Sequence, residues 1–206
     1  MTRTKICGLT RPEDVRAALD AGADALGFIL YPKSKRHVTP DQAAALLASV
    51  PPFVSTVAVL VDPSAEEVRG LAARLPFTHF QLHGKETPET VAALRPLKII
   101  KALTLPADPA LVKAYEAAGV EAFLLDTPAP EHGGTGRTFD WGLVPAFAAQ
   151  TALPFFLSGG LTPDNVGAAI ERVRPYGVDV ASGVEASPGV KDHQKIARFI
   201  AACRLP

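Results

Sequence analysis

The strongest constraint on the fold is a repeated alternation between two kinds of segment along the whole chain. Short apolar runs typical of β-strands alternate with amphipathic segments typical of α-helices. Runs such as Val57–Val61 are apolar at successive positions, which is expected when both faces of a strand are buried. The expected strands are Thr4–Cys7, Ala25–Ile29, Ser55–Val61, His79–Leu82, Lys98–Ala102, Ala122–Asp126, Phe155–Ser158 and Gly177–Ala181. Eight strand–helix units in series predict an α/β fold with a parallel sheet.

Turn and capping residues mark where the expected helices begin and end. Thr10-Arg11-Pro12-Glu13 combines a threonine N-cap candidate with an early proline and a Glu at capping-box spacing, and Thr39-Pro40-Asp41-Gln42 repeats the Thr-Pro start. Gly22 and Gly119 follow alanines where a helix should end before a strand. The last helix, Asp192–Cys203, is expected to close the ring against the first unit.

A closed barrel and an open doubly wound sheet both fit this alternation. The doubly wound alternative is weakened because no Gly-x-Gly-x-x-Gly follows the first strand. The chain has 206 residues, which suits one domain and is near the lower limit for eight complete units. We therefore predict a single (β/α)8 TIM barrel over residues 1–206, with a closed parallel sheet of eight strands.

Composition argues against several classes of function. Lysine plus arginine and aspartate plus glutamate each number 21, so the formal net charge is zero and no global field recruits nucleic acid or an anionic membrane. No apolar run approaches the roughly 18 residues of a membrane span, and the N-terminal residues lack a secretory pattern. Two cysteines far apart do not make a disulfide framework. A cytoplasmic protein is expected.

Two glycine-containing strand ends near the C-terminus favour a phosphate site. The segments Phe155–Leu161 and Val178–Glu185 each pass from an apolar run into Ser-Gly. Glycine lets a ligand approach backbone N–H groups, and a following helix N-terminus adds partial positive charge. Barrels of this class commonly bind phosphate after strands seven and eight. The alternative is that these glycines only form tight turns.

Other strand ends supply candidate acid–base groups, because the C-terminal ends of barrel strands converge on one open face. Cys7 could be a small buried hydrophobe, but its place before a glycine suggests that the thiol faces this opening. Its ordinary pKa of about 8.5 would need lowering to give useful thiolate at neutral pH. Asp126 could pair structurally or act as a catalytic acid. Placed across the opening, Cys7 and Asp126 would form an acid–base pair.

Each of the remaining segments and polar residues at this face has more than one interpretation. The basic loop Lys33–His37 is either a solvated surface or an anion site, in which an arginine suits a carboxylate. The glycine-rich loop Gly133–Gly136 is a lid, a phosphate-facing loop or a plain turn. His83 and Lys101 could contact substrate or satisfy a neighbour. No motif with metal-ligand spacing is present, so no metal is expected.

Six motifs together resemble those of the phosphoribosylanthranilate isomerase family of tryptophan biosynthesis. They run in order over nearly the whole chain as Lys5-Ile6-Cys7-Gly8-Leu9-Thr10, Gln81-Leu82-His83-Gly84, Leu124-Leu125-Asp126, Gly133-Gly134-Thr135-Gly136, Ser158-Gly159-Gly160-Leu161 and Ser182-Gly183-Val184-Glu185. The resemblance implies a (β/α)8 barrel that catalyses an Amadori rearrangement without cofactor or metal. The implied partner is a small phosphosugar–anthranilate substrate, and the protein is expected to be a monomer or homodimer.

The resemblance also implies residue roles. Cys7 would be the general base and Asp126 the general acid, and Arg36 would meet the anthranilate carboxylate. The other substrate-binding residues would be His83, Gly134, Gly159, Gly160, Asp179, Ser182 and Gly183, with the phosphate at the glycines and Ser182. Three positions depart from the usual family pattern, namely Lys35, Ser158 and Ala181.

Rival functions remain at this point. A pentose-phosphate epimerase would need a His/Asp metal set, which the sequence does not offer. A Schiff-base aldolase would need a lysine at a strand end, for which Lys101 is the candidate. A non-catalytic binder of phosphate ligands would have kept the glycine-containing strand ends and lost the catalytic groups. The presence of both Cys7 and Asp126 argues against this alternative.

Overall fold

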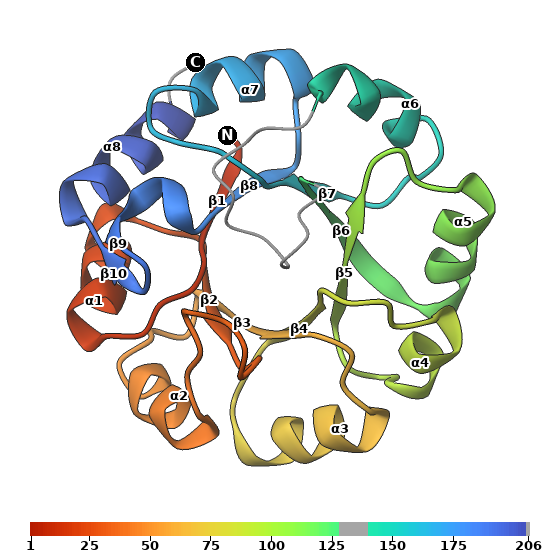
Figure 1. Cartoon of the computed structure of the whole chain (residues 1–206), viewed down its shortest axis with the longest axis horizontal. Coiled ribbons are helices and arrows are strands. Elements are labelled where there is room, and N and C mark those ends of the chain that lie inside the picture. The colour runs from red at the N-terminus through yellow and green to blue at the C-terminus, as the bar shows by residue number, and fades with distance from the viewer. Residues whose placement is uncertain (128–139, 205–206) are drawn as a thin grey trace.

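The computed structural model describes residues 1–127 and 140–204, and these form a closed barrel (Figure 1). Eight parallel strands follow one another in chain order around the ring, and the last strand pairs with the first. The strands are β1 Arg3–Ile6, β2 Ala25–Ile29, β3 Ser55–Leu60, β4 His79–Leu82, β5 Ile99–Thr104, β6 Val120–Asp126, β7 Phe155–Leu157 and β8 Gly177–Val180. The predicted TIM barrel is confirmed, and the doubly wound alternative is wrong.

Helices form the outer ring around the strands (Figure 1). They are α1 Pro12–Ala21, α2 Pro40–Leu47, α3 Ala65–Arg74, α4 Pro88–Ala93, α5 Pro109–Ala118, α6 Val144–Ala148, α7 Val166–Val173 and α8 His193–Arg204, with short 3-10 helices η1 Trp141–Leu143 and η2 Ser182–Val184. Helix α8 packs against α1, as expected for the segment that closes the ring. None of the helices in the described ranges is both long and apolar enough to cross a bilayer.

Most of the capping signals act as the sequence predicts. Thr39 forms a capping box with Gln42, and Gly22 and Gly119 end their helices in the left-handed conformation, with φ of 88° and 103°. Thr10 is an exception, because Arg11 occupies the N-cap position of α1 and the Thr10 hydroxyl donates to the carbonyl of Gly189 instead. A long-range partner has therefore displaced a local cap.

The strands are buried on both faces, which explains their continuous apolar runs. Alternate side chains point outward to the helices, as Phe80 and Leu82 of β4 do, or inward to the barrel axis. The inward set includes an apolar cluster of Cys7, Ala25, Val57, Val59, Ile100, Ala102, Ala122 and Leu124. This alternation places particular polar side chains inside the barrel, at the end where the strands finish.

The segment after β8 differs from the expected simple turn into a helix. The 3-10 helix η2 leads into a small antiparallel hairpin of β9 Glu185–Ser187 and β10 Val190–Lys191 before α8 begins. In Figure 1 this hairpin lies beside α1 and α8. The hairpin brings Glu185 and Lys191 toward the open face, where both contact site residues.

Candidate active site

One cavity at the C-terminal ends of the strands collects most of the predicted site. Its lining includes Cys7, Arg36, His83, Asp126, Gly159, Gly160, Asp179, Ser182 and Gly183. These residues come from β1, β4, β6, β7 and β8 and from the loops that follow the strands, so the barrel brings together positions far apart in the sequence. Gly134, also predicted to bind substrate, lies outside the described residues.

Cys7 lies directly after β1 and is nearly inaccessible, with 5% of its surface exposed. A Cβ added to Gly27 would lie 2.8 Å from the Cys7 Sγ and 3.1 Å from the Lys5 Nζ, so the missing side chain makes room for both groups. Burial raises the pKa of the Cys7 thiol above its ordinary value, and the negative charge of Asp179 raises it further. The positive charges of Lys5 and Lys191 act in the opposite direction. Burial of the thiol therefore works against the lowered pKa that a thiolate base needs.

Beneath Cys7, the barrel interior holds an ion pair. Lys5 Nζ lies 2.8 Å from Asp179 Oδ1, and the side chains are 2% and 6% exposed. Burial alone would lower the pKa of Lys5, but the carboxylate of Asp179 raises it above the ordinary value, so Lys5 is charged. The hydroxyl of Ser158 donates to the other carboxylate oxygen of Asp179 at 3.0 Å. Asp179 thus lines the cavity with both oxygens already engaged by protein groups.

Asp126 ends β6 and forms part of a chain of side-chain hydrogen bonds. Its Oδ1 accepts from the Thr127 backbone N–H at 2.8 Å, and its Oδ2 lies 3.1 Å from His83 Nε2. The Nδ1 of His83 lies 2.8 Å from Nε2 of Gln81. His83 therefore contacts the proposed acid directly, which gives it a role beside Asp126 rather than at the phosphate.

Arg36 is held by a carboxylate of the protein itself. Its Nε and Nη2 each donate to Glu185 at 2.7 Å, while Lys191 Nζ lies 3.1 Å from Glu185 Oε1. The hydrogen bond from Arg36 is the main reason why the pKa of Glu185 stays low despite burial, and Lys191 also contributes. A Cβ on Gly8 would lie 2.6 Å from Arg36 Cδ, so this glycine lets the arginine lie across the end of β1.

Two glycine-containing turns form the opposite rim of the cavity. Gly159 and Gly160 adopt φ of 82° and 65°, which residues with a side chain rarely adopt. A Cβ on Gly183 would lie 1.8 Å from the Leu161 carbonyl oxygen, which shows how closely the two turns pack. Within the described part of the chain, the N–H groups of Gly159, Gly160, Ser182 and Gly183 have no acceptor. Unpaired donors at one edge of a cavity are suited to an anion.

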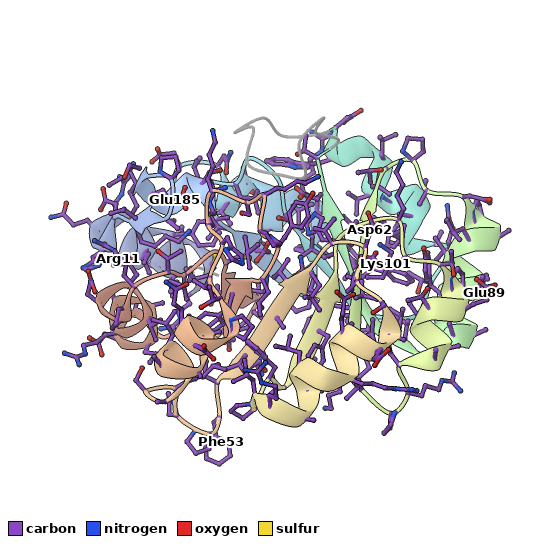
Figure 2. The ribbon with its side chains drawn as sticks, turned by 60° about the horizontal axis from the view of Figure 1, so that its bottom comes forward. Arg11, Phe53, Asp62, Glu89, Lys101 and Glu185 are labelled. Carbon is purple, nitrogen blue, oxygen red and sulfur yellow. The ribbon has the colours of Figure 1, made fainter. Side chains whose placement is uncertain are left out.

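Lys101 does not lie at the opening, which corrects its reading as a strand-end nucleophile. The side chain points outward from β5, is buried, and donates to the carbonyls of Leu82 and Gly84 and to Glu86 at 2.8 to 3.2 Å. Figure 2 shows it among the β-strands and helices of the barrel wall. All three donors of the ammonium are engaged, so Lys101 is a structural residue and gives the aldolase reading no support.

Residues 1–127 and 140–204 contain no group of three or more His, Cys, Asp or Glu side chains placed to hold a metal ion. The acidic and imidazole groups at the opening are instead paired with cations or with one another, as in Glu185 with Arg36 and Asp126 with His83.

Sequence reasoning missed four residues that shape the site. Lys5, Gln81, Ser158 and Glu185 stand within the quoted motifs but had no assigned role. Lys5 and Gln81 carried a usable signal, since each is a polar residue inside an otherwise apolar strand and shares the inward register of Cys7 or His83. The contact between Glu185 and Arg36 had no local signal, because 149 positions separate the two.

Comparison with known proteins shows the family to which the chain belongs. The family model of N-(5'phosphoribosyl)anthranilate (PRA) isomerase matches residues 4–202. The N-(5'-phosphoribosyl)anthranilate isomerase of Thiobacillus denitrificans is 52% identical over 205 residues, which cover 98% of each chain. That of Pelobacter propionicus is 46% identical over 201 residues, covering 97% of this chain and 94% of the relative.

Solved structures give the same result. The phosphoribosyl anthranilate isomerase of Thermotoga maritima superposes with a TM-score of 0.90 at 41% identity, and 99% of each chain is covered. A phosphoribosyl anthranilate isomerase in complex with reduced 1-(o-carboxyphenylamino)-1-deoxyribulose 5-phosphate superposes with a TM-score of 0.86 at 38% identity, again over 99% of each chain. The chain is therefore an enzyme that belongs to the N-(5'-phosphoribosyl)anthranilate isomerase family.

Proposed function

We propose that this enzyme converts N-(5-phosphoribosyl)anthranilate to 1-(2-carboxyphenylamino)-1-deoxyribulose 5-phosphate in tryptophan biosynthesis, with Asp126 as general acid and Cys7 as general base. The observation that carries the proposal is the shared cavity. In it, a thiol from the end of β1 and a carboxylate from the end of β6 lie beside a rim of backbone N–H groups that have no acceptor among residues 1–127 and 140–204. An aldose–ketose shift needs one donor, one acceptor and an anchor for the phosphate.

In the first step, Asp126 gives its proton to the furanose ring oxygen as the bond from C1 to that oxygen breaks. The lone pair of the anthranilate nitrogen forms a C=N bond, which leaves a protonated Schiff base. The Cys7 thiolate then removes the proton from C2 and gives a neutral enolamine. Transfer of a proton to C1 and loss of the O2 proton produce the ketose, so the reaction is neutral in protons overall.

The position of the charges favours this assignment of roles. The Lys5 and Lys191 ammonium groups favour the thiolate form of Cys7 and so oppose the larger effect of burial, which raises its pKa. Positioned acid–base groups contribute typically about 10²–10⁴-fold each. The phosphate would lie at Gly159, Gly160, Ser182 and Gly183, and Arg36 would offer its Nη1 to the anthranilate carboxylate while Glu185 holds its Nε and Nη2.

His83 is proposed to bind substrate indirectly, through Asp126, and Asp179 to shape the cavity while paired with Lys5. Gly134 remains a proposed phosphate contact from the loop after β6. We propose that the protein is a monomer or a homodimer. One solved relative is described as a monomer generated from dimeric Thermotoga maritima phosphoribosylanthranilate isomerase.

The decisive test is the decay of anthranilate fluorescence when purified protein meets freshly made phosphoribosylanthranilate in the presence of EDTA. Wild-type protein should cause rapid decay, while Cys7→Ala and Asp126→Asn should lose about 10²-fold or more in kcat. We expect Asp126→Asn to impair turnover far more than the affinity for a phosphate ligand, because the amide keeps the size of the carboxylate beside Gly159 and removes only the acid. Equal losses in both quantities, or full activity of either variant, would disprove these roles.

A further inference from the structure

Gln81 has a buried amide oxygen that the site described so far does not explain. The residue is 1% exposed and lines the cavity, yet its Oε1 has no hydrogen-bond partner in the described structure. A buried polar atom without a partner costs about 1–3 kcal/mol. An unpaired acceptor kept inside the candidate site suggests that the atom is used in another state of the site.

The neighbouring contacts show which state that could be. Gln81 is on β4 and His83 directly follows that strand, so the two residues, two positions apart, share its inward face. The amide Nε2 of Gln81 donates to His83 Nδ1 at 2.8 Å, so Nδ1 is the unprotonated ring nitrogen. The ring proton of neutral His83 is then on Nε2, which lies 3.1 Å from Asp126 Oδ2 and donates to it. This arrangement fits an ionised Asp126.

A general acid must carry its proton before the reaction. Oδ1 of Asp126 already accepts from the Thr127 N–H, and the arrangement above cannot hold the proton on Oδ2. If Asp126 Oδ2 were protonated, His83 Nε2 would have to accept, and the ring proton of neutral His83 would be on Nδ1. Two donors, the ring N–H and the Gln81 amino group, would then face each other. Rotating the Gln81 amide by half a turn removes this conflict, because Oε1 takes the place of Nε2 and accepts from Nδ1–H without any change in volume.

We propose that Gln81 is a positioning residue for the acid step, which matches the tautomer of His83 to the protonation state of Asp126 by turning its amide. With the amino group toward His83, Asp126 is the carboxylate. With Oε1 toward His83, Asp126 carries the proton that it gives to the ring oxygen of the substrate. This inference rests on the proposed role of Asp126 as general acid.

The two states differ by one proton on the Asp126–His83 pair, and the amide rotation itself transfers none. The proton leaves Asp126 for the substrate ring oxygen in the reaction, and solvent at the open face returns one to the pair after product release. The ring proton of His83 exchanges between its two nitrogens through the same solvent. Gln81 thus supplies a partner to Nδ1 of His83 in both states, while the other end of its amide lacks a partner within the described residues in each.

The test is nitrogen NMR of protein with 15N-labelled histidine rings, together with steady-state kinetics. In ligand-free wild-type protein, His83 should be the Nε2–H tautomer. In Gln81→Glu, which offers only acceptors, His83 should carry a proton on Nδ1, and in Gln81→Leu both tautomers should be populated. Both variants should lose about tenfold or more in kcat, and KM should change less than about threefold. A positioned acid contributes about 10²–10⁴-fold to the rate, and a misplaced proton should remove part of that contribution.

Gln150→Leu is the matched control. Gln150 also has a buried amide oxygen without a partner in the described structure, but it lies before β7, at the other end of the barrel from the site. This variant should keep the wild-type His83 tautomer and kcat. It therefore separates the general effect of removing a buried amide from the proposed effect of Gln81 on His83. Circular dichroism checks that each variant is folded.

The outcomes separate this inference from the proposed function. A wild-type His83 that is already the Nδ1–H tautomer in the ligand-free protein overturns the inference without any variant. It is also overturned if the tautomer and kcat are unchanged in both Gln81 variants while Asp126→Asn is inactive, and in that case the acid role of Asp126 survives. Full activity of Asp126→Asn would overturn both.

Discussion

The ammonium of Lys5 lies 2.8 Å from the carboxylate of Asp179 inside the barrel, between residues 174 positions apart in the chain. Lys5 is on the first strand and Asp179 on the last, and these strands pair where the barrel closes. The closing seam of the fold is therefore also the base of the candidate active site. Cys7, two residues beyond Lys5 on the same inward register, lies directly above this pair.

Lys5→Met should be strongly destabilising, because it leaves the buried Asp179 carboxylate without its cation. Breaking one partner of a buried ion pair costs about 3–5 kcal/mol, and we expect a loss of that size in urea unfolding. The double variant Lys5→Met/Asp179→Asn should recover part of it, since no uncompensated charge remains. A loss below about 1 kcal/mol, or a double variant less stable than the single one, would contradict this account.

Cys7 should react as a thiol with a raised pKa. In Cys203→Ala protein, where Cys7 is the remaining cysteine, the rate of modification by iodoacetamide should rise about tenfold per pH unit while thiolate is the minor form. Burial raises the pKa of Cys7, so this rise should continue past the ordinary value of about 8.5. Mass spectrometry gives the rate, and a plateau reached below pH of about 8 would show that the thiol is activated in the free enzyme.

Cys203 provides a second pH effect, on stability rather than on reactivity. Burial in α8 raises its pKa to about 12. The folded protein therefore keeps the Cys203 proton at pH values where the unfolded chain loses it. The contribution of this group to the free energy of unfolding is complete below about pH 8.5. Above that value it declines by up to about 1.4 kcal/mol per pH unit. The slope of unfolding free energy between pH 9 and 10 should be shallower in Cys203→Ala than in wild type, and equal slopes would count against the shift.

Glu185→Gln should weaken substrate binding through Arg36. An amide cannot accept from both Nε and Nη2 of Arg36, so the guanidinium loses the bidentate contact that orients it. We expect KM for phosphoribosylanthranilate to rise about tenfold, or about 1.4 kcal/mol, with a smaller change in kcat. Glu89→Gln, on the exposed surface of α4, is the control and should leave both unchanged. An unaltered KM in Glu185→Gln would remove Glu185 from the site.

Gly183→Ala should disrupt the proposed phosphate rim. The added Cβ would lie 1.8 Å from the carbonyl oxygen of Leu161, so one of the two turns must move. KM should rise about tenfold or more with little change in kcat, since the phosphate lies away from the reacting carbon. Gly167→Ala in the neighbouring helix α7 is the control, because its Cβ would meet nothing within 4 Å, and it should be neutral or stabilising by about 1 kcal/mol. Equal kinetics in both variants would place the phosphate elsewhere.

Local patterns in the sequence predicted the elements well. The strands Ala25–Ile29 and His79–Leu82 have the predicted bounds, and the other predicted strands differ from the observed ones by one or two residues at one or both ends. The pattern succeeds because strand burial, capping boxes and C-terminal glycines act over a few residues. It failed at Thr10, whose hydroxyl bonds to Gly189, and it gave no sign of the hairpin β9–β10.

The sequence by itself determined the order of eight strand–helix units, the polar residues at the strand ends and the family to which their motifs belong. Only the tertiary structure decided which of those residues meet. Closure of the ring pairs Lys5 with Asp179, the hairpin brings Glu185 to Arg36, and the outward register of Lys101 removes it from the opening. The physical reason is that these contacts depend on the register between distant strands, which the side-chain pattern of any single segment does not contain.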